Sequence, residues 1–281
     1  MCDNLCVISL LTGIIVRIFS NSGLNVFQKL LTERGGHSSV VNFYTYFGLS
    51  LISLVMLPFL SIQMSADLVL NFICMGLLGA LGNYFIIKAL SKGELSSLAP
   101  INSYKPIVAL IIGFLYLKEV PSYAAVLGIC LIIFGTFIMY SQKLITNNEA
   151  VLYRIYALIF SGTEAVFIKK VLLLTGVAES FVLWSFAGLL FSSFFILISK
   201  KPLKIVSIKY QLLLVLSVAF MQYSTNFVFS KINVAYALAI FQLSTILSVF
   251  LGISIFDEKN LMRKICASCI MVAGAVLILL F

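Results

Sequence analysis

Long apolar runs alternate along the chain with short polar and charged breaks. Stretches such as 107–117 and 127–139 are apolar on every side, whereas strands of a membrane β-barrel alternate polar and apolar residues. A membrane-spanning helix needs about 20 mostly apolar residues. The pattern predicts ten such helices, at roughly residues 6–32, 40–60, 67–90, 96–117, 122–140, 151–174, 179–198, 209–230, 235–256 and 261–281.

The composition supports this interpretation. Hydrophobic residues make up 62 % of the 281 positions and charged residues only 10 %. Soluble domains are about 45–50 % apolar and about 25 % charged, so this chain lacks the polar groups that cover a soluble surface. The composition therefore excludes a cytosolic enzyme, a secreted disulfide scaffold and a disordered chain. We predict an all-α integral membrane protein with ten transmembrane helices.

The second half of the chain resembles the first. A shift of 139 residues aligns 80–135 with 219–274 without a gap, and small and polar residues match in register with the span boundaries. Earlier in the chain, 22–29 resembles 161–169 with one residue inserted. The chain is therefore predicted to consist of two homologous five-helix repeats.

We place these repeats at 1–141 and 142–281. Because five is an odd number of crossings, the second repeat must enter the membrane from the opposite side. Two inverted repeats are typical of transporters, whose substrate site lies near the midplane between the halves.

The formal charge of +9 is interpreted through topology rather than nucleic-acid binding. The loops on one face, with their flanks, hold thirteen basic residues: Lys29, Arg34, Lys88, Lys92, Lys143, Arg154, Lys200, Lys201, Lys204, Lys209, Lys259, Arg263 and Lys264. The opposite face holds four: Lys118, Lys169, Lys170 and Lys231. The positive-inside rule then puts the first face in the cytoplasm and both termini outside, in a multi-pass protein of the plasma (bacterial inner) membrane.

Prolines, glycines and acidic residues recur around the predicted fourth, fifth, ninth and tenth spans. They are Leu98-Ala99-Pro100, Pro106, Gly113, Leu117-Lys118-Glu119, Gly128 and Gly135, then Gly252, Asp257-Glu258 and Gly274. With these motifs the chain resembles the EamA-type ten-helix proteins of the drug/metabolite transporter superfamily over essentially its whole length. The second half departs from the pattern because it has no proline at 239 or 245.

The resemblance implies a secondary transporter, often an exporter of amino acids, metabolites or drugs, commonly driven by protons or by exchange. It also implies cytoplasmic termini, whereas the charge count puts them outside. The orientation therefore stays open.

Charged side chains near the middle of three predicted spans are the main functional candidates, because a charge at mid-membrane is costly. They are Arg17, Lys105 and Glu164. Two cations against one anion favour a carboxylate or phosphate group on the substrate, and Glu164 is the candidate proton carrier. In the alternative interpretation, a cation pairs with Glu164 and only locks two helices together.

Amide and aromatic side chains at matching depths complete the predicted substrate site, because such groups orient ligands in transporter pockets. They are Asn21, Asn25, Asn83, Tyr84, Asn102, Tyr104, Trp184, Gln222, Tyr223 and Gln242. Tyr44 and Tyr46 fit an interfacial aromatic belt at least as well. Glu119 and Glu258, at span ends, are expected to make structural contacts there.

The sequence thus predicts a carrier that moves a small anionic or zwitterionic metabolite, such as an amino acid, by alternating access as a proton-coupled exporter or exchanger. The main alternative is a broad exporter of hydrophobic or cationic compounds, and a lesser one is a channel or scaffold. We expect no enzyme, since neither catalytic nor nucleotide-binding motifs occur. Expected partners are the substrate, lipid and protons, with no cofactor, metal or nucleic acid; a monomer would suffice.

Overall fold

The computed structural model describes residues 2–93, 98, 101–140, 148–244, 246–247 and 261–280. Within these ranges the α-helices are α1 (Cys2–Glu33), α2 (Ser38–Met56), α3 (Ala66–Lys92), α5 (Lys105–Tyr116), α6 (Tyr123–Tyr140), α7 (Asn148–Leu174), α8 (Val177–Ser199), α9 (Ile208–Lys231), α10 (Val234–Phe241) and α12 (Leu261–Leu280). A single 3₁₀ turn, η1 (Leu57–Phe59), follows α2. Each predicted span overlaps one of these α-helices, so the all-α, ten-helix prediction is confirmed.

Several predicted features lie outside the described residues. They are the repeat boundary at 141/142, the motif residues Ala99, Pro100, Gly252, Asp257 and Glu258, and the loop lysines Lys143 and Lys259.

The bundle buries a set of polar side chains beside its apolar core and exposes large apolar side chains on its outside. Arg17, Gln28 and Asn42 are buried, whereas Val55 and Leu197 are 72 % and 74 % exposed. In the described part of the chain, five helices are long and apolar enough to cross a membrane: Val7–Glu33, Ser38–Phe59, Ala66–Lys92, Val177–Ser199 and Ile208–Lys231. A surface of this kind suits lipid, while buried polar groups need partners inside the bundle. The chain is a multi-pass membrane protein.

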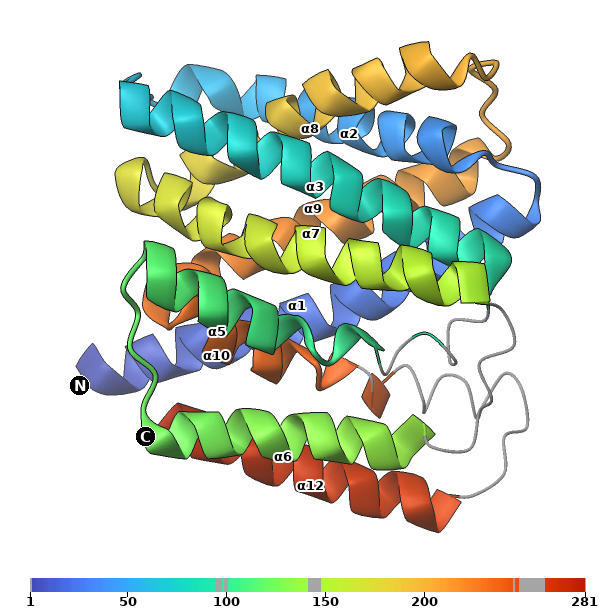
Figure 1. Cartoon of the computed structure of the whole chain (residues 1–281). Coiled ribbons are helices and arrows are strands. Elements are labelled where there is room, and N and C mark those ends of the chain that lie inside the picture. Colours follow the sequence, from blue (N-terminus) through green and yellow to red (C-terminus); the bar gives the residue numbers. More distant parts are fainter. Residues whose placement is uncertain are drawn as a thin grey trace.

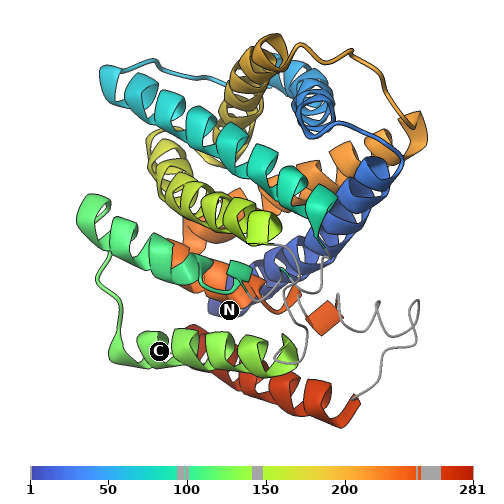
Figure 2. The same ribbon diagram turned by 45° about the vertical axis from the view of Figure 1, so that its right-hand side comes forward.

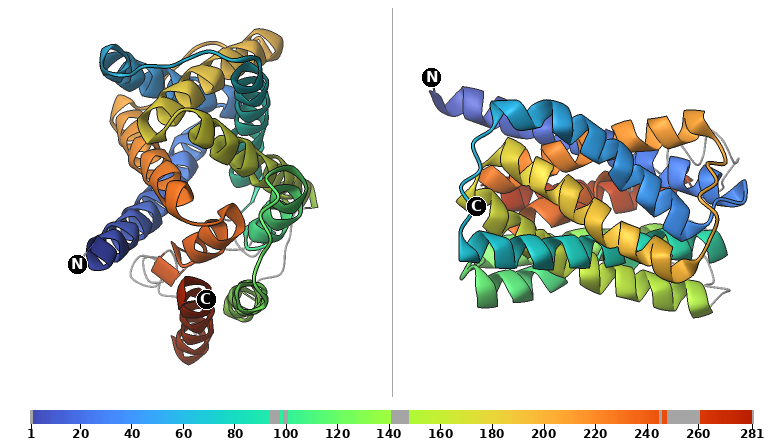
Figure 3. Two further views of the ribbon diagram at one scale, coloured as in Figure 1. Left: turned by 90° about the vertical axis from the view of Figure 1, so that its left-hand side faces the viewer. Right: turned by 90° about the horizontal axis from the view of Figure 1, so that it is seen from above.

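The helices run side by side along the length of the bundle, in alternating directions (Figure 1). Figures 2 and 3 show α2 and α8 along one edge, α6 and α12 along the opposite edge, and the other helices between them. The chain enters α1 and leaves α12 at the same end of the bundle, as ten crossings require. We call this the terminal end, and we call the opposite end, which holds connections 34–37 and 200–207, the basic end.

Short side chains fix several helix starts. The side-chain oxygens of Ser65, Ser207 and Asn233 accept hydrogen bonds from backbone N–H groups in the first turns of α3, α9 and α10. Such caps satisfy donors that have no partner within the helix. Between α7 and α8 the connection is only two residues long, and Gly176 turns the chain there at a φ of +137°.

The packing of the helices is unchanged when the two halves are exchanged. α1 packs along α9 and, equivalently, α7 packs along α3, while α2 and α6 pack against their own counterparts α8 and α12. This is the arrangement expected of two five-helix repeats in opposite orientations.

Individual contacts between α6 and α12 show the same symmetry. A Cβ added to Gly128 would lie 2.6 Å from the Gly274 carbonyl oxygen, and one added to Gly135 would lie 2.9 Å from the Ala267 carbonyl oxygen. The 139-residue shift relates Gly128 to Ala267 and Gly135 to Gly274. The two close approaches are therefore equivalent contacts, related by the exchange of the two halves.

Candidate functional site

A polar cavity of about 120 Å³ lies inside the bundle, between the helix pair α1/α9 and the helix pair α3/α7. Ten of the thirteen residues predicted for the site line it: Arg17, Asn21, Asn25, Asn83, Asn102, Lys105, Glu164, Trp184, Gln222 and Gln242. The structure thus brings together residues from α1, α3, α7, α8 and α9, and from the segments around the starts of α5 and the end of α10.

Two interrupted helices contribute to the cavity wall. The predicted fourth and ninth spans are each broken by a tight turn, at 103–104 and at 242–243, and the 139-residue shift relates the two breaks. The Asn102 amide nitrogen donates a hydrogen bond of 3.5 Å to the Gln242 side-chain oxygen, so the two breaks face each other. Broken helices at corresponding positions of two repeats are typical of transporter binding sites.

The missing prolines of the second half do not prevent this break. At Gln242 and Leu243 the backbone N–H groups donate to the carbonyls three residues earlier, in turns of the 3₁₀ type. The second half therefore forms the same turn without proline.

Three cations and one carboxylate line the cavity: Arg17, Lys105, Arg154 and Glu164. Arg154 is not among the predicted site residues, because the sequence analysis counts it with the basic residues that flank a loop at the membrane surface. It is only 5 % exposed and lies two turns inside α7, which begins at Asn148. Its spacing of ten residues from Glu164 puts the two side chains about 80° apart around α7, so both can reach a cavity on the same side of the helix.

Glu164 is held by Trp184, whose Nε1–H donates a hydrogen bond of 2.6 Å to Oε1. Gly79 leaves the space for this pair, since an added Cβ would overlap the Glu164 carboxylate and lie 3.5 Å from Trp184 Nε1. The Tyr46 ring lies 5.1 Å from the Trp184 ring and is 1 % exposed. Tyr46 therefore belongs to the wall of the site and not to an interfacial belt.

No cation lies within 4.0 Å of the Glu164 carboxylate in the described part of the chain. The interpretation in which Arg17 or Lys105 forms a lock with Glu164 does not describe this structure. The cations and the carboxylate therefore line the cavity without forming an ion pair with one another.

Arg17 is fixed on one side and free on the other. Its Nε donates a hydrogen bond of 2.7 Å to Thr225 Oγ1, and its guanidinium lies 4.8 Å from the centre of the Phe241 ring. Arg17 Nη1 and Arg154 Nε are buried and have no hydrogen-bond partner among the described residues. A buried donor without a partner is costly, so these two groups are suited to bind an acceptor on a ligand.

Amide side chains form much of the remaining wall and bond to polar neighbours. The bonds are Asn21 Nδ2 to Ser244 Oγ (3.0 Å), Gln28 Nε2 to Asn83 Oδ1 (3.1 Å), Asn83 Nδ2 to Asn42 Oδ1, and Gln222 Nε2 to Asn226 Oδ1 (2.8 Å). These bonds fix the orientation of the groups that would contact a ligand.

Tyr84, Tyr104 and Tyr223 do not line the cavity. Neighbouring residues on an α-helix point about 100° apart, so Tyr84 and Tyr223, each next to a cavity-lining amide, are turned away from the cavity. Tyr84 packs instead against Phe195, and Tyr104 and Tyr223 are 44 % and 43 % exposed.

At the terminal end, Glu119 makes the structural contact that the sequence predicted for it. Its Oε2 accepts a hydrogen bond of 3.2 Å from the Val234 N–H at the start of α10. Burial raises the pKa of the Glu119 carboxyl above its ordinary value, while the Val234 N–H and the nearby Lys169 ammonium act in the opposite direction.

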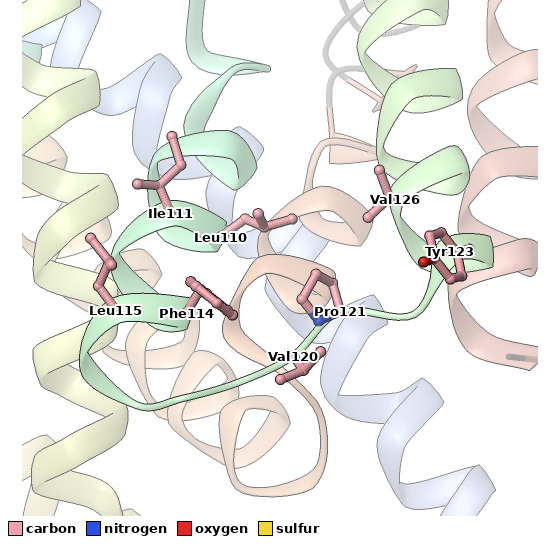
Figure 4. Close-up of a pocket in the computed structure, with 8 residues that line it drawn as sticks. All are labelled: Leu110, Ile111, Phe114, Leu115, Val120, Pro121, Tyr123 and Val126. Carbon is pink, nitrogen blue, oxygen red and sulfur yellow. The ribbon is translucent and has the colours of Figure 1, made fainter.

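A second cavity, of about 500 Å³, lies between the end of α5 and the start of α6 (Figure 4). Its lining is apolar except for the Tyr123 hydroxyl: Leu110, Ile111, Phe114, Leu115, Val120, Pro121, Tyr123 and Val126. Most of these side chains are exposed on the outer surface of the bundle. The chemistry of this cavity suits lipid chains, and it shares no residue with the central site.

Comparison with known proteins gives a family match for the first half of the chain. Residues 8–141 match the EamA-like transporter family. The uncharacterized protein MJ1333.1 of Methanocaldococcus jannaschii is 27 % identical over 134 residues, which are 47 % of this chain and 95 % of that protein. The relative therefore has about the length of one five-helix half.

A protein of known crystal structure shares the fold. The superposition has a TM-score of 0.74 and covers 96 % of this chain and 94 % of the other, at 14 % sequence identity. At that identity the likeness concerns the fold alone.

Proposed function

Because residues 8–141 match the EamA-like transporter family, we propose that the chain is a secondary transporter for a small anionic or zwitterionic metabolite. The observation that carries this proposal is the charge of the central cavity. Arg17, Lys105 and Arg154 face it with a single carboxylate, Glu164, so its formal charge is positive.

The free donors suit a carboxylate or phosphate group. A guanidinium presents a planar fork of N–H groups that matches the oxygens of such anions, and Arg17 Nη1 and Arg154 Nε are buried donors without partners in the described part of the chain. A zwitterionic substrate would place its ammonium group toward Glu164. The cavity volume of about 120 Å³ fits a compact metabolite better than a large drug.

Glu164 is the proposed proton carrier. It is the only carboxylate among the described residues that line the cavity, and its position between the two helix pairs would let it meet either side of the membrane in turn. Substrate and proton would then share one alternating site, as exchange or proton-coupled export requires.

The proposed orientation has the basic end in the cytoplasm, following the positive-inside rule. The usual family arrangement, with cytoplasmic termini, is the opposite one. Labelling of a Lys200→Cys variant in intact cells by an impermeant thiol reagent distinguishes them, since only the second exposes that residue outside.

A ligand screen tests the substrate class. We expect small carboxylates, amino acids or phosphate esters to raise the melting temperature of the purified protein. Hydrogen bonds to charged groups contribute about 1.5–3 kcal/mol, so Arg17→Ala, Lys105→Ala or Arg154→Ala should weaken binding by about tenfold or more.

Lys88→Ala is the matched control. Lys88 is also a cation within a span, but its ammonium lies 4.3 Å from the centre of the Tyr153 ring and does not line the cavity. If the best ligand is a neutral or cationic drug, and no cavity variant changes its binding, the anion proposal is wrong and the drug exporter is favoured. Counterflow of the labelled ligand in proteoliposomes then separates a carrier from a channel or scaffold.

A further inference from the structure

The ammonium group of Lys29 ties the end of α1 to the end of α3. Its Nζ donates hydrogen bonds of 3.1 Å to the Leu90 carbonyl and 3.2 Å to the Gly93 carbonyl. The last carbonyls of a helix have no partner within it and form the negative end of its dipole, so a cation there is stabilising.

Lys169 makes the same tie between α7 and α9. Its Nζ donates to the Phe229 carbonyl and, at 3.2 Å, to the Ile232 carbonyl. Lys169 is only 8 % exposed, although the sequence suggested a surface charge.

The two ties occupy equivalent positions in the two halves. The segment that ends at Lys29 matches the segment that ends at Lys169, and the 139-residue shift relates the acceptor carbonyls of one tie to those of the other, residue for residue. Figure 1 shows that α1 and α7 finish at opposite ends of the bundle. One tie therefore lies at the basic end and its counterpart at the terminal end.

Both ties join the same two bodies. α1 and α9 pack along each other, as do α3 and α7. Lys29 links α1 to α3, and Lys169 links α7 to α9, so each tie connects the α1/α9 pair to the α3/α7 pair. The central cavity lies between these pairs and between the two ties.

We propose that Lys29 and Lys169 are the gate residues of the transport cycle, an inference that rests on the proposed function. When the two helix pairs rock apart at the basic end, the Lys29 tie opens and the Lys169 tie acts as the pivot. When they rock apart at the terminal end, the two lysines exchange these roles. The present structure, with both ties formed, corresponds to the step between the two open states.

Other polar groups lie near each tie. At the terminal end, Glu119 is close enough to Lys169 to interact with it electrostatically and also holds the start of α10. At the basic end, Gln28 bonds to Asn83 beside the Lys29 tie. The position equivalent to Gln28 in the second half is 168, and it is an isoleucine, which cannot form such a bond. The lysines, by contrast, join the two helix pairs in both halves.

Accessibility of the cavity from each side tests the proposal. In the full chain with its six cysteines replaced, Ser161→Cys supplies a reporter, since Ser161 lines the cavity and its hydroxyl has no partner among the described residues. An impermeant thiol reagent is applied to intact cells and to inverted vesicles. Separate Lys200→Cys and Thr175→Cys variants identify which side of the membrane holds each end of the bundle.

We expect Lys29→Ala to speed labelling of the reporter from the basic end by about tenfold, and Lys169→Ala to speed it from the terminal end by a similar factor, because charge-assisted hydrogen bonds are among the strong ones. Each change should leave labelling from the other end equal or slower. Lys29→Arg and Lys169→Arg keep a cationic donor and should restore the parent rates.

Two neighbouring lysines are matched controls. Lys92 pairs with Glu149 on the surface at the basic end, and Lys170 lies 3.3 Å from Asp67 at the terminal end. Lys92→Ala and Lys170→Ala should change neither rate. If an alanine variant does not fold, Lys29→Met or Lys169→Met keeps the alkyl stem and is measured in its place.

The inference fails if both gate variants speed labelling from the same end, or if neither changes it, since the lysines would then be helix caps alone. No substrate is present in this measurement. If the two variants shift labelling in opposite directions but the ligand screen fails, the gate proposal holds and only the proposed substrate class is wrong.

Discussion

At the residue scale, the site depends on how one carboxylate is held. Glu164 accepts a hydrogen bond from Trp184 in a space that Gly79 leaves open, and no described cation is close enough to form an ion pair with it. A carboxylate held by a neutral donor near a polar cavity is suited to take up and release a proton. A carboxylate locked by a cation would be less so.

Glu164→Gln should therefore separate coupling from translocation. The amide oxygen can still accept the Trp184 hydrogen bond, so the site keeps its shape, but the side chain no longer binds a proton. We expect exchange of labelled for unlabelled substrate at equal pH to persist, while accumulation driven by a pH gradient is lost.

Proteoliposome flux with and without a pH gradient measures both quantities. Glu149→Gln, at the exposed start of α7, is the control and should leave both unchanged. If pH-driven accumulation survives Glu164→Gln, this carboxylate is not the proton carrier.

At the element scale, the close crossings of helices depend on glycine. α6 and α12 approach so closely at Gly128 and Gly274 that a Cβ on either residue would lie 2.6 Å from the other's carbonyl oxygen. A backbone oxygen cannot move aside as a flexible side chain would. This crossing fixes the distance between two helices that lie at the edge of the bundle (Figure 2).

Gly128→Ala and Gly274→Ala should each destabilise the protein by about 1–3 kcal/mol, the range for overpacking a tight contact. The double variant should cost less than the sum of the single ones, because the first substitution has already separated the helices. Thermal unfolding in detergent measures all three.

Gly113→Ala is the matched control. An added Cβ there would meet only Glu119 Oε2, at an ordinary contact distance of 3.5 Å, and the gain in helix propensity is the same. Strict additivity of the two α6/α12 variants would show that the glycines do not share one contact.

At the scale of the whole molecule, the two halves share one hydrophobic core. The main helix pairs, α1/α9, α2/α8, α3/α7, α5/α10 and α6/α12, all form between the halves. Each half therefore presents to the other the faces on which its polar residues lie.

Two fragments, 1–141 and 142–281, should consequently assemble when they are expressed together. We expect a tag on one fragment to purify both, and the pair to recover the substrate counterflow of the intact chain. A fragment produced with an unrelated membrane protein serves as the control. Recovery of either fragment as a stable monomer would contradict this view, and failure to co-purify would show that the boundary is misplaced.

The sequence by itself determined the helices and the charged centre of the site. Helix number follows from sequence because bilayer thickness sets the length of each apolar run, and Arg17, Lys105 and Glu164 stood out because charge in lipid is costly. The repeat could be recognised in the sequence because equivalent helix contacts require small and polar residues at equivalent positions of the two halves.

Only the tertiary structure decided which side chains share a space. Arg154 and Tyr46 belong to the cavity wall, and Tyr84 and Tyr223 do not, because the rotation of each helix is set by its neighbours and not by depth in the membrane. The gate role proposed for Lys29 and Lys169 likewise depends on carbonyls 60 or more residues away in the chain, which folding alone brings within reach.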